Sequence, residues 1–503
     1  MSRSTLPVDA LRQAFEAFPE EVAHGTQPPD LAEMYVVPGH ESALNPDTAV
    51  VVGDRGTGKS FWSAALNGET TRLVIGRQLK RLRLENVHVS WGFSSGVDNR
   101  YHPSRRVLGR LLEDGFRAED IWRAVILSQL TGASADSIFE GAEGWTARVR
   151  HVADHPEMEE RILASVDAEL RDRGERHLVV FDALERVGDD WSRIRELLRG
   201  LLRVGLDLRA YRSIRTKFFL RPDMWEDEGI WRFPDSSKLT HGSVRLKWNR
   251  ADLYALLWHR LGNDHAGGEA FRDWLTSAHG ASFETVESDG AVVYVAPEKL
   301  RMSDAAQAEV LNSIASPFMG HNRRRGKTHT WLPTHLADAK GQISPRSFLV
   351  ALKKAREITE RQYADEGVLL YFEAIKQGVQ EASRLRVNEL REDYPWIRQI
   401  LEALEGMTVP APAEELYARW RDIGVLGAIR SGPEIGYEED DAPYLLPHAL
   451  ETPAASDREE DALIEAAIEI GVMSRTADGR INIPDLFRVA AGIGRRGGVR
   501  AIR

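Results

Sequence analysis

Cysteine is absent from the 503-residue sequence. Its absence excludes a disulfide scaffold, a thiolate metal site and a cysteine nucleophile, and it fits a reducing compartment such as the cytoplasm. No run of about 18 apolar residues occurs, so we expect no membrane span. Residues 1–19 lack the apolar segment of a signal peptide, and the 15 histidines show no paired spacing typical of a zinc site. We therefore expect a cytoplasmic protein.

The composition is that of a folded protein with more than one domain. Hydrophobic residues make up 42% of the chain and charged residues 28%, which leaves enough apolar material for large cores. A chain of this length is too long for one core, so we expect two or three domains. The net charge of −11 argues against a protein that coats nucleic acid over its whole surface.

Three segments stand out from this average by their charge. Basic side chains cluster at 323–327 and again in the tail at 495–503, and four acidic residues follow one another at 438–441. Solvated loops are the simple interpretation of all three. The basic tail is also a candidate contact surface for nucleic acid.

Short apolar runs alternate with helical periodicity in the first half of the chain. Runs bounded by turn residues are typical of buried parallel strands, and strands that alternate with helices indicate βαβ units around a mainly parallel sheet. The predicted strands are 48–52, 71–75, 87–91, 177–182 and 216–220. The predicted helices of this half are 8–24, 61–66, 117–130, 157–173 and 190–204.

After residue 225 the pattern becomes mainly helical. The predicted helices are 248–261, 347–358, 365–404, 459–470 and 485–491, and a linker rich in proline, glycine and acidic residues spans 431–457. Asp478-Gly479 is typical of a hairpin turn. Helices around a small hairpin suggest a winged-helix-like module at the C-terminal end.

The strongest chemical pattern is an octapeptide between a predicted strand and a predicted helix. It consists of Gly53, Asp54, Arg55, Gly56, Thr57, Gly58, Lys59 and Ser60. Its glycines let backbone N–H groups face one concavity, and the helix N-terminus adds positive potential, as phosphate binding requires. Lys59 would reach the β- and γ-phosphates, and the Ser60 hydroxyl would bind Mg²⁺. The pattern predicts a P-loop that binds ATP or another nucleoside triphosphate with Mg²⁺.

Asp182 and Glu185 are the predicted metal and water residues. Asp182 ends the apolar run 177–182, which we expect to lie next to the P-loop strand, and a carboxylate there would hold Mg²⁺ through water. Glu185 lies three residues further on and could orient the attacking water. In a second interpretation Asp182 only caps the loop that follows the strand.

Arg221 and Arg346 are candidates for contact with the γ-phosphate. Arg221 follows the predicted strand 216–220, at whose exit it could report the terminal phosphate. Arg346 lies in the first turn of a helix whose start Ser344 and Pro345 predict, and it could reach over the nucleotide from a lid. The alternatives are an arginine that caps the end of the sheet and an arginine on the surface.

Together these elements resemble the P-loop NTPases of the AAA+ and STAND group, and most closely the KAP-like and related bacterial ATPases. In that group an apolar strand is often followed by Asp-Asp-Leu-Asp-Arg, and here residues 182–186 are Asp-Ala-Leu-Glu-Arg. Ala183 takes the place of the second acid, where many AAA+ proteins have the catalytic glutamate. The resemblance therefore makes Glu185 the candidate base and implies slow hydrolysis or switch-like behaviour.

The same resemblance extends to the two arginines. Arg221 matches the sensor arginine of STAND proteins, and Ser344-Pro345-Arg346 resembles the Asn-Pro-Arg lid motif of KAP-type proteins. The likeness covers residues 40–360 and is weak elsewhere. It implies self-association, because neighbouring subunits of such proteins can supply an arginine to the nucleotide.

The expected fold class is α/β: a P-loop NTPase with a mainly parallel sheet, then a helical lid, then a mostly helical, winged-helix-like module. We expect an N-terminal helix and connector at 1–40 and the NTPase core at 41–245. The lid would span 246–364 and the C-terminal module 365–503.

Three functions are open to such a chain. The first is an ATP-binding and ATP-hydrolysing regulatory switch that self-associates and acts with an effector or sensor partner; the resemblance implies a role in signalling or anti-phage defence. The second is a nucleic-acid-directed, AAA+-like ATPase of the initiator type, with the basic tail from Arg488 to Arg503 as its contact surface. The third is a small-molecule kinase, which the about 280 residues beyond the core disfavour.

Overall fold

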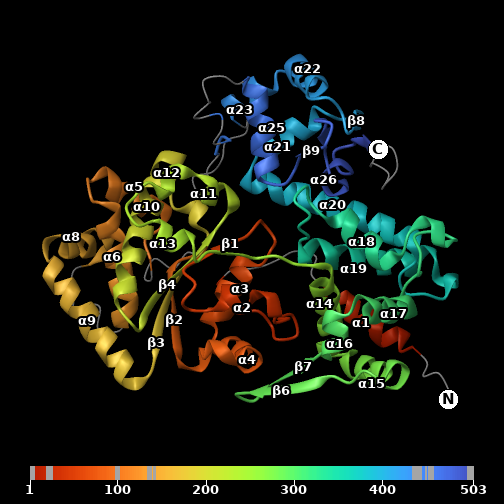
Figure 1. The fold of residues 1–503 in the computed structure, drawn as a ribbon, viewed down its shortest axis with the longest axis horizontal. Coiled ribbons are helices and arrows are strands. Elements are labelled where there is room, and N and C mark those ends of the chain that lie inside the picture. Colours follow the sequence, from red (N-terminus) through yellow and green to blue (C-terminus); the bar gives the residue numbers. More distant parts are fainter. Residues whose placement is uncertain are drawn as a thin grey trace.

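The computed structural model describes residues 6–18, 26–96, 102–132, 139, 143–432, 445–447, 450 and 458–495. Figure 1 shows a part with a central sheet on the left, a helical part on the right and a C-terminal module above them. The acidic segment 438–441 and the tail from 496 onwards lie outside the described residues, as does most of the predicted linker 431–457.

A five-stranded parallel sheet forms the centre of the first part, as the sequence predicts. Its strands are β1 (Val50–Val52), β2 (Val87–Phe93), β3 (Arg176–Phe181), β4 (Ile214–Leu220) and β5 (Val244–Arg245). They lie in the order β2-β3-β4-β1-β5, and every neighbouring pair is parallel. The carboxyl ends of all of them therefore meet at one edge of the sheet.

Helices cover both faces of this sheet. Val51 of β1 packs into the same core as α3 and α4, whereas its neighbours Val50 and Val52 face the core formed with α6 and α10. Because both faces are buried, the strands have continuous apolar sequences. The helices of this part are α2 (Glu41–Leu44), α3 (Lys59–Asn67), α4 (Glu69–Gln78), α5 (Arg105–Glu113), α6 (Ala118–Thr131), α8 (Gly144–Asp154), α9 (Pro156–Arg173), α10 (Trp191–Asp207), α11 (Pro222–Glu226), α12 (Glu228–Trp231) and α13 (Ser237–Thr240).

Two expectations about the sheet are wrong. The run 71–75 is helical and belongs to α4, because its buried residues Thr71, Val74 and Ile75 have the i, i+3, i+4 spacing of one helix face. The Asp182 strand β3 is not next to the P-loop strand, since β4 lies between them. The short edge strand β5 was not anticipated either.

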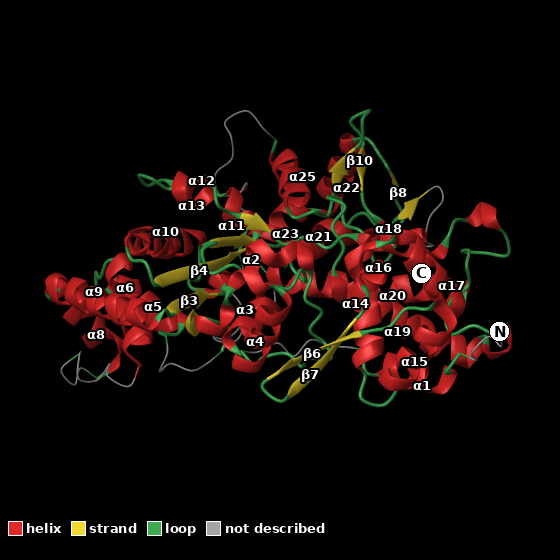
Figure 2. Cartoon of the chain, turned by 60° about the horizontal axis from the view of Figure 1, so that its bottom comes forward, coloured by secondary structure: helices red, strands yellow, loops and turns green. Residues whose placement is uncertain are grey.

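The helical part follows the sheet in the sequence. It contains α14 (Arg250–Asn263), α15 (Gly268–His279), α16 (Glu298–Met302), α17 (Asp304–Ile314), α18 (Thr328–Leu336), α19 (Pro345–Gln362) and α20 (Phe372–Asp393). The N-terminal helix α1 (Val8–Glu16) packs against α14, α15 and α19. An antiparallel hairpin of β6 (Glu284–Ser288) and β7 (Ala291–Val295), which the sequence did not reveal, lies between α4 of the sheet part and α14 (Figure 2).

The C-terminal module is mostly helical with a small hairpin, as the sequence predicts. Its elements are α21 (Trp396–Glu402), β8 (Thr408–Val409), α22 (Ala413–Ile423), α23 (Val425–Ser431), α25 (Glu459–Glu469), β9 (Ser474–Arg475), β10 (Ile481–Asn482), α26 (Asp485–Arg488) and β11 (Gly494–Arg495). Strands β9 and β10 are antiparallel, and the turn between them contains Gly479 with φ 81°. The predicted hairpin at Asp478-Gly479 is thus confirmed, and the module is winged-helix-like.

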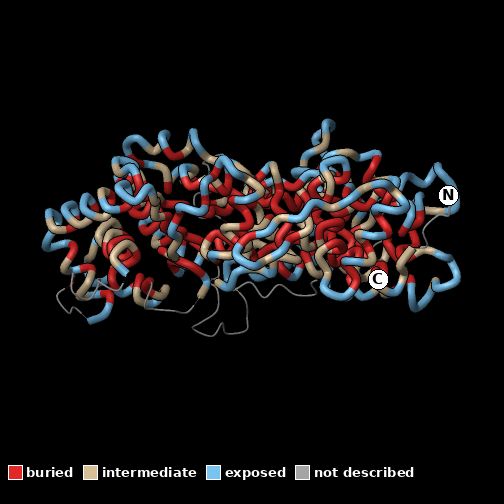
Figure 3. Tube along the Cα trace, turned by 90° about the horizontal axis from the view of Figure 1, so that it is seen from below, coloured by how far each residue is buried: buried red, intermediate tan, exposed pale blue. Residues whose placement is uncertain are grey.

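A continuous core joins these parts. The cluster of buried residues that contains Val51 of the sheet also contains Tyr254 of α14, Phe348 of α19 and Phe487 of α26. Figure 3, a view from below, shows buried residues along the long axis of the molecule. Among the described residues, no helix has both the length and the hydropathy to cross a bilayer.

Helix α20 packs closely against α19 at Gly378. A Cβ atom added there would lie 2.1 Å from the carbonyl oxygen of Ala351 on α19, far inside van der Waals contact. A side chain of any size must therefore push the two helices apart.

We predict that Gly378→Ala destabilises the protein by about 1–3 kcal/mol. The added Cβ would clash with a backbone carbonyl oxygen, which cannot move aside as the end of a flexible side chain can. Urea denaturation measures this loss. Gly427→Ala is the matched control: Gly427 lies in α23 with nothing within 4 Å of the added Cβ. It should be neutral or up to about 1 kcal/mol more stable, as helix propensity requires. Equal effects of the two substitutions would contradict the packing argument.

Candidate nucleotide-binding site

The P-loop connects β1 to α3 at the carboxyl edge of the sheet. Gly56 and Gly58 have φ values of 78° and 103°, in the left-handed region that glycine adopts without strain. The Thr57 hydroxyl donates to the Asp54 carbonyl at 2.7 Å, which closes the loop on itself. The backbone thus has the concave form that the sequence pattern predicts.

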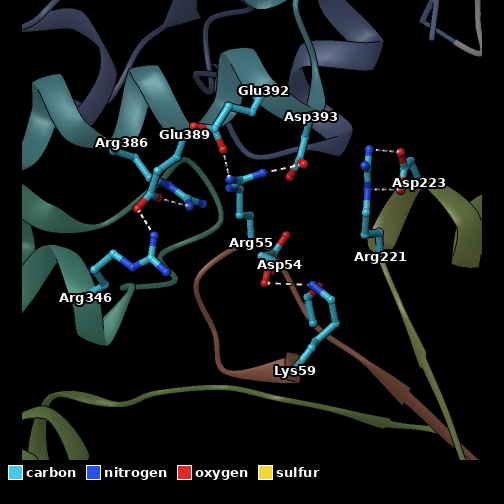
Figure 4. A network of polar contacts seen from close by, with 11 residues as sticks. Asp54, Arg55, Lys59, Arg221, Asp223, Arg346, Arg386, Glu389, Glu392 and Asp393 are labelled. Carbon is cyan, nitrogen blue, oxygen red and sulfur yellow. Dashed lines mark hydrogen bonds and ion pairs between the residues drawn. The ribbon is translucent and has the colours of Figure 1, made fainter. Parts of the chain in front are cut away.

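Lys59 is folded back onto the loop that contains it. Its Nζ atom donates to the carbonyl oxygens of Gly53, at 2.7 Å, and Asp54, at 3.2 Å (Figure 4). Burial lowers the pKa of Lys59, and the carboxylates of Glu185 and Asp182 oppose that shift. The Lys59 ammonium group, which donates to these carbonyls here, is the group that would bind phosphate oxygens of a nucleotide.

Asp182 is linked through Ser63 to Ser60, the last residue of the P-loop. The Ser63 hydroxyl donates both to the Ser60 carbonyl, at 3.0 Å, and to Asp182 Oδ2, at 3.3 Å. Asp182 is 3% exposed, and its Oδ1 atom is buried with no hydrogen-bond partner in the part of the chain that the structure describes. An orphaned carboxylate oxygen next to a serine fits Mg²⁺, which takes oxygen ligands and completes its shell with water and phosphate.

The described residues contain no cluster of three or more His, Cys, Asp or Glu side chains that could hold a metal alone. Ser60 and Asp182 would therefore supply only part of a metal shell, as is usual for Mg²⁺ bound with a nucleotide. Their geometry fits the predicted metal site, and their role in it stays a prediction.

Glu185 follows Asp182 on a short 3₁₀ turn, η5 (Leu184–Arg186). Burial raises the pKa of Glu185 above its usual range, and the nearby cations of Arg221 and Lys59 oppose the rise. Ala183, which takes the place of the second acid, has φ 55°. This left-handed backbone is uncommon outside glycine and fixes the direction in which the chain leaves β3.

Arg221 does lie at the exit of β4, but it is already paired. Its Nη2 and Nε atoms donate to the two carboxylate oxygens of Asp223 at 2.6 and 3.2 Å. Its guanidinium lies over the Tyr394 ring, 4.2 Å from the centroid. The residue is only 4% exposed, so a γ-phosphate contact would require Arg221 to exchange these partners.

The start of the lid helix α19 touches the P-loop. The Ser344 hydroxyl, which caps α19, donates to the Gly56 carbonyl at 3.3 Å. Arg346, in the first turn, forms an ion pair with Glu389 of α20, and Glu389 also pairs with Arg386 at 3.3 Å (Figure 4). The structure thus brings Arg346 to the rim of the site, where it faces a carboxylate of its own chain.

The acidic end of α20 is the part of the site that sequence reasoning missed. Arg55 of the P-loop forms ion pairs with both Glu392 and Asp393 (Figure 4). Burial alone would raise the pKa of Asp393, but the cations of Arg221 and Arg55 hold this pKa below its usual range. The only signal in the sequence was the Glu-Leu-Arg-Glu-Asp run 389–393, which we interpreted only as part of a helix.

A cavity of about 250 Å³ opens at the start of the P-loop. It is lined by Val52, Gly53, Asp54, Arg245, Leu246, Lys247, Lys340 and Gln342. Lys340 and Gln342 come from the loop just before α19, so the core and the lid both form its walls. Pockets that bury small ligands usually measure about 300–1,000 Å³. A whole nucleoside triphosphate would therefore need the loop before α19 to move.

His40 joins the N-terminal connector to segments on either side of the P-loop, a contact that no sequence pattern predicts. Its Nδ1 atom accepts from Trp62 Nε1 at 3.0 Å, and its Nε2 atom lies 3.0 Å from the Lys247 carbonyl. Both contacts fit a neutral ring with the proton on Nε2. Trp248, edge-on to the same ring, donates from Nε1 to the Thr57 carbonyl at 2.9 Å.

No family model matches this chain. No curated protein matches it either. Among solved structures it is similar to the ORC2 protein of Aeropyrum pernix, with 15% identity, 94% of this chain and 93% of that chain covered, and a TM-score of 0.30. It is also similar to a Walker-type ATPase of Pyrococcus abyssi, with 13% identity, 92% and 98% covered, and a TM-score of 0.36.

A third similar structure is Cdc6p from Pyrobaculum aerophilum, with 11% identity, 91% and 93% covered, and a TM-score of 0.29. These likenesses are distant. The class of the protein is defined by its own geometry, which is that of a P-loop NTPase: a parallel sheet, a glycine loop between β1 and α3, and Asp182 at the end of β3. The closeness to KAP-like and STAND proteins stays an expectation.

The neutral state of His40 predicts acid sensitivity. Burial lowers the pKa of His40 from its usual value near 6.5 to about 4. Because the unfolded state takes up the proton first, the contribution of His40 to stability is complete above pH 6.5 and is lost as the pH falls towards 4. Between these limits the wild type should lose up to about 3 kcal/mol more than His40→Gln.

Urea denaturation at steps from pH 7.5 to 4 measures the difference. The exposed His241 provides the control: His241→Gln should follow the wild type over the whole range. Parallel pH profiles for the wild type and His40→Gln would show that the ring is not held neutral.

Proposed function

We propose that this protein is an ATP-binding and ATP-hydrolysing regulatory switch. One observation carries the proposal: the P-loop arginine Arg55 is held by Glu392 and Asp393, the last two residues of α20. The anions that neutralise the nucleotide site thus belong to the helix that leads into the C-terminal module.

A triphosphate and these carboxylates would compete for the same cations. Arg55, Lys59 and Arg221 each bear on Asp393, whose lowered pKa reports their combined field. Phosphate oxygens in the P-loop would offer these cations stronger partners than a single carboxylate can. Nucleotide binding would then release the end of α20. The free energy of this shift, from the state with α20 bound to the P-loop to the released state, is set by how much more tightly the nucleotide binds the released state.

Release at this point would reach the C-terminal module directly. Tyr394 follows Asp393 and covers Arg221, and Pro395 precedes α21. Movement of Tyr394 would uncover Arg221, and if phosphate oxygens then replaced Asp223 and Glu389, Arg221 and Arg346 could contact the γ-phosphate, in this subunit or in a neighbouring one. Self-association and binding of an effector or sensor partner are the expected outputs, and signalling or anti-phage defence is the proposed setting.

The chemistry proposed for the site is phosphoanhydride hydrolysis. Mg²⁺, held by Ser60 and Asp182, would neutralise phosphate charge when bound. Lys59 would bind the β- and γ-phosphates, and Glu185 would orient the water and take its proton as the bond to the γ-phosphorus forms and the bond to the ADP oxygen breaks. Because burial raises the pKa of Glu185, its carboxylate is a stronger base than that of an exposed glutamate.

A nucleic-acid-directed ATPase of the initiator type is the second candidate, because the C-terminal module is winged-helix-like. Of the predicted contact surface from Arg488 to Arg503, Arg488 is buried and paired with Asp485, and the residues from 496 onwards lie outside the described ones. The proposed domains are an N-terminal connector (1–40), an NTPase core (41–245), a lid (246–364) and a C-terminal module (365–503).

The first test is nucleotide binding and phosphate release by the purified protein. Lys59→Ala should abolish ATP binding, because the loop then lacks its phosphate cation. Glu185→Gln should bind ATP but hydrolyse it at least about 100-fold more slowly, since the water loses its base. It should also accumulate a larger species on size exclusion with ATP and Mg²⁺. Lys80→Ala, at an exposed lysine, is the control. A wild type that neither binds nor hydrolyses nucleotide would overturn the proposal.

The second test removes the internal anions. The double variant Glu392→Gln with Asp393→Asn should bind ATP about 5- to 100-fold more tightly, the range expected for a coupling of this kind. Isothermal calorimetry measures it. The matched control is Glu373→Gln with Glu381→Gln, two acids of the same helix that pair with Lys376 and Arg384. Unchanged or weaker binding by the first variant would mean that the carboxylates do not compete with the nucleotide.

A further inference from the structure

A basic loop at 320–327 joins α17 to α18 on the helical part. Its sequence is Gly-His-Asn-Arg-Arg-Arg-Gly-Lys, and residues 321–327 are all exposed. Arg323, Arg324 and Arg325 form a 3₁₀ turn with none of its residues buried. None of these three arginines, nor Lys327, makes an ion pair with any residue that the structure describes.

The arginines of the C-terminal module behave differently. Arg475 pairs with Glu465 at 2.5 Å and Arg480 pairs with Asp478 at 2.7 Å, so the cations beside and on the hairpin are neutralised. Arg488 is buried against Asp485. Of these two described segments, the loop on the helical part therefore has unpaired cations, whereas the hairpin arginines are paired.

The basic loop has a fixed backbone. The Met319 N–H donates to the Gly326 carbonyl at 3.0 Å, and the Arg324 N–H donates to Asn322 Oδ1 at 3.1 Å. Phe318 and Lys327 form an antiparallel bridge that closes the loop. Four cations are thus presented on an ordered turn, and less ordering entropy is lost on binding than for a flexible tail.

We propose that the basic loop binds the phosphate backbone of nucleic acid. Residues 321–327 present guanidinium groups, one ammonium, one amide and one imidazole, and no aliphatic or large aromatic side chain. Protein partners and membranes are usually held through an apolar anchor as well as charge. A surface of charge and donors alone matches phosphate contacts, which position a protein on nucleic acid without reading its sequence.

The loop is remote from the nucleotide site. His321 packs edge-on against Phe372, the first residue of α20, with ring centroids 5.1 Å apart. Asp393 is the last residue of this helix, which at 1.5 Å per residue is about 33 Å long. The inference deepens the second candidate function, but it rests on no nucleotide chemistry, so its failure would leave the ATPase proposal intact.

The test is binding of fluorescent single-stranded DNA, duplex DNA and RNA probes of mixed sequence by the full chain, over a series of salt concentrations. The triple variant Arg323→Ala, Arg324→Ala, Arg325→Ala should bind at least tenfold more weakly at low salt. The slope of log K against log salt should fall by about 2–3, since each lost phosphate contact removes about 1. The triple lysine variant at the same positions should retain most of the affinity.

The matched control removes three cations elsewhere. Arg77, Lys80 and Arg81 are equally exposed, and their alanine variant should bind like the wild type. Equal losses in the two alanine variants would overturn the proposal, because they would reflect overall charge and not this loop. The proposal would also be overturned if the wild type bound no nucleic acid probe at low salt. The same holds if it bound polyglutamate or anionic vesicles more tightly than the nucleic acid probes.

Discussion

Positive charge concentrated at one edge of a parallel sheet is the constraint on which the rest of the structure depends. Arg55, Lys59 and Arg221 converge where β1 and β4 end, and buried or half-buried cations need partners. The chain supplies them from three sources: loop carbonyls for Lys59, Asp223 for Arg221, and the end of α20 for Arg55. A phosphate-binding site is thus neutralised by the protein itself.

This neutralisation explains how the parts are arranged around the sheet. The end of α20 reaches the P-loop only because α20 packs along α19, whose own start contacts Gly56. The cavity next to the loop measures about 250 Å³ and is lined by the core and by the loop before α19. The lid and the end of α20 therefore both contact the P-loop, the lid through Ser344 and α20 through its ion pairs with Arg55.

Local signals predicted the parts of the site that lie close together in sequence. The glycine loop, the helix after it and the strand before Asp182 follow from eight consecutive residues and from continuous apolar runs, and the parallel sheet follows from their alternation. The order of the strands does not, because crossover connections, and not local patterns, decided that β4 lies between β1 and β3. The run 71–75 was misassigned because a short apolar run does not by itself distinguish a strand from a helix.

The acidic end of α20 could not have been assigned from the sequence, since Arg55 and Glu392 are 337 positions apart. The same holds for His40, whose partners Trp62 and Lys247 come from separate segments. Ion pairs and buried hydrogen bonds between distant segments require the fold to be known first. The charge cluster 323–327 was visible in the sequence, but only the structure separates it from the paired arginines of the hairpin.

The most direct test of the central claim is hydrogen–deuterium exchange of the segment 386–396 with and without ATP and Mg²⁺. If nucleotide phosphates replace Glu392 and Asp393 as partners of Arg55, exchange in this segment should rise on nucleotide binding while exchange in the P-loop falls, and Lys59→Ala should show neither change. Protection of both segments together, or an unchanged α20 at saturating nucleotide, would contradict the account.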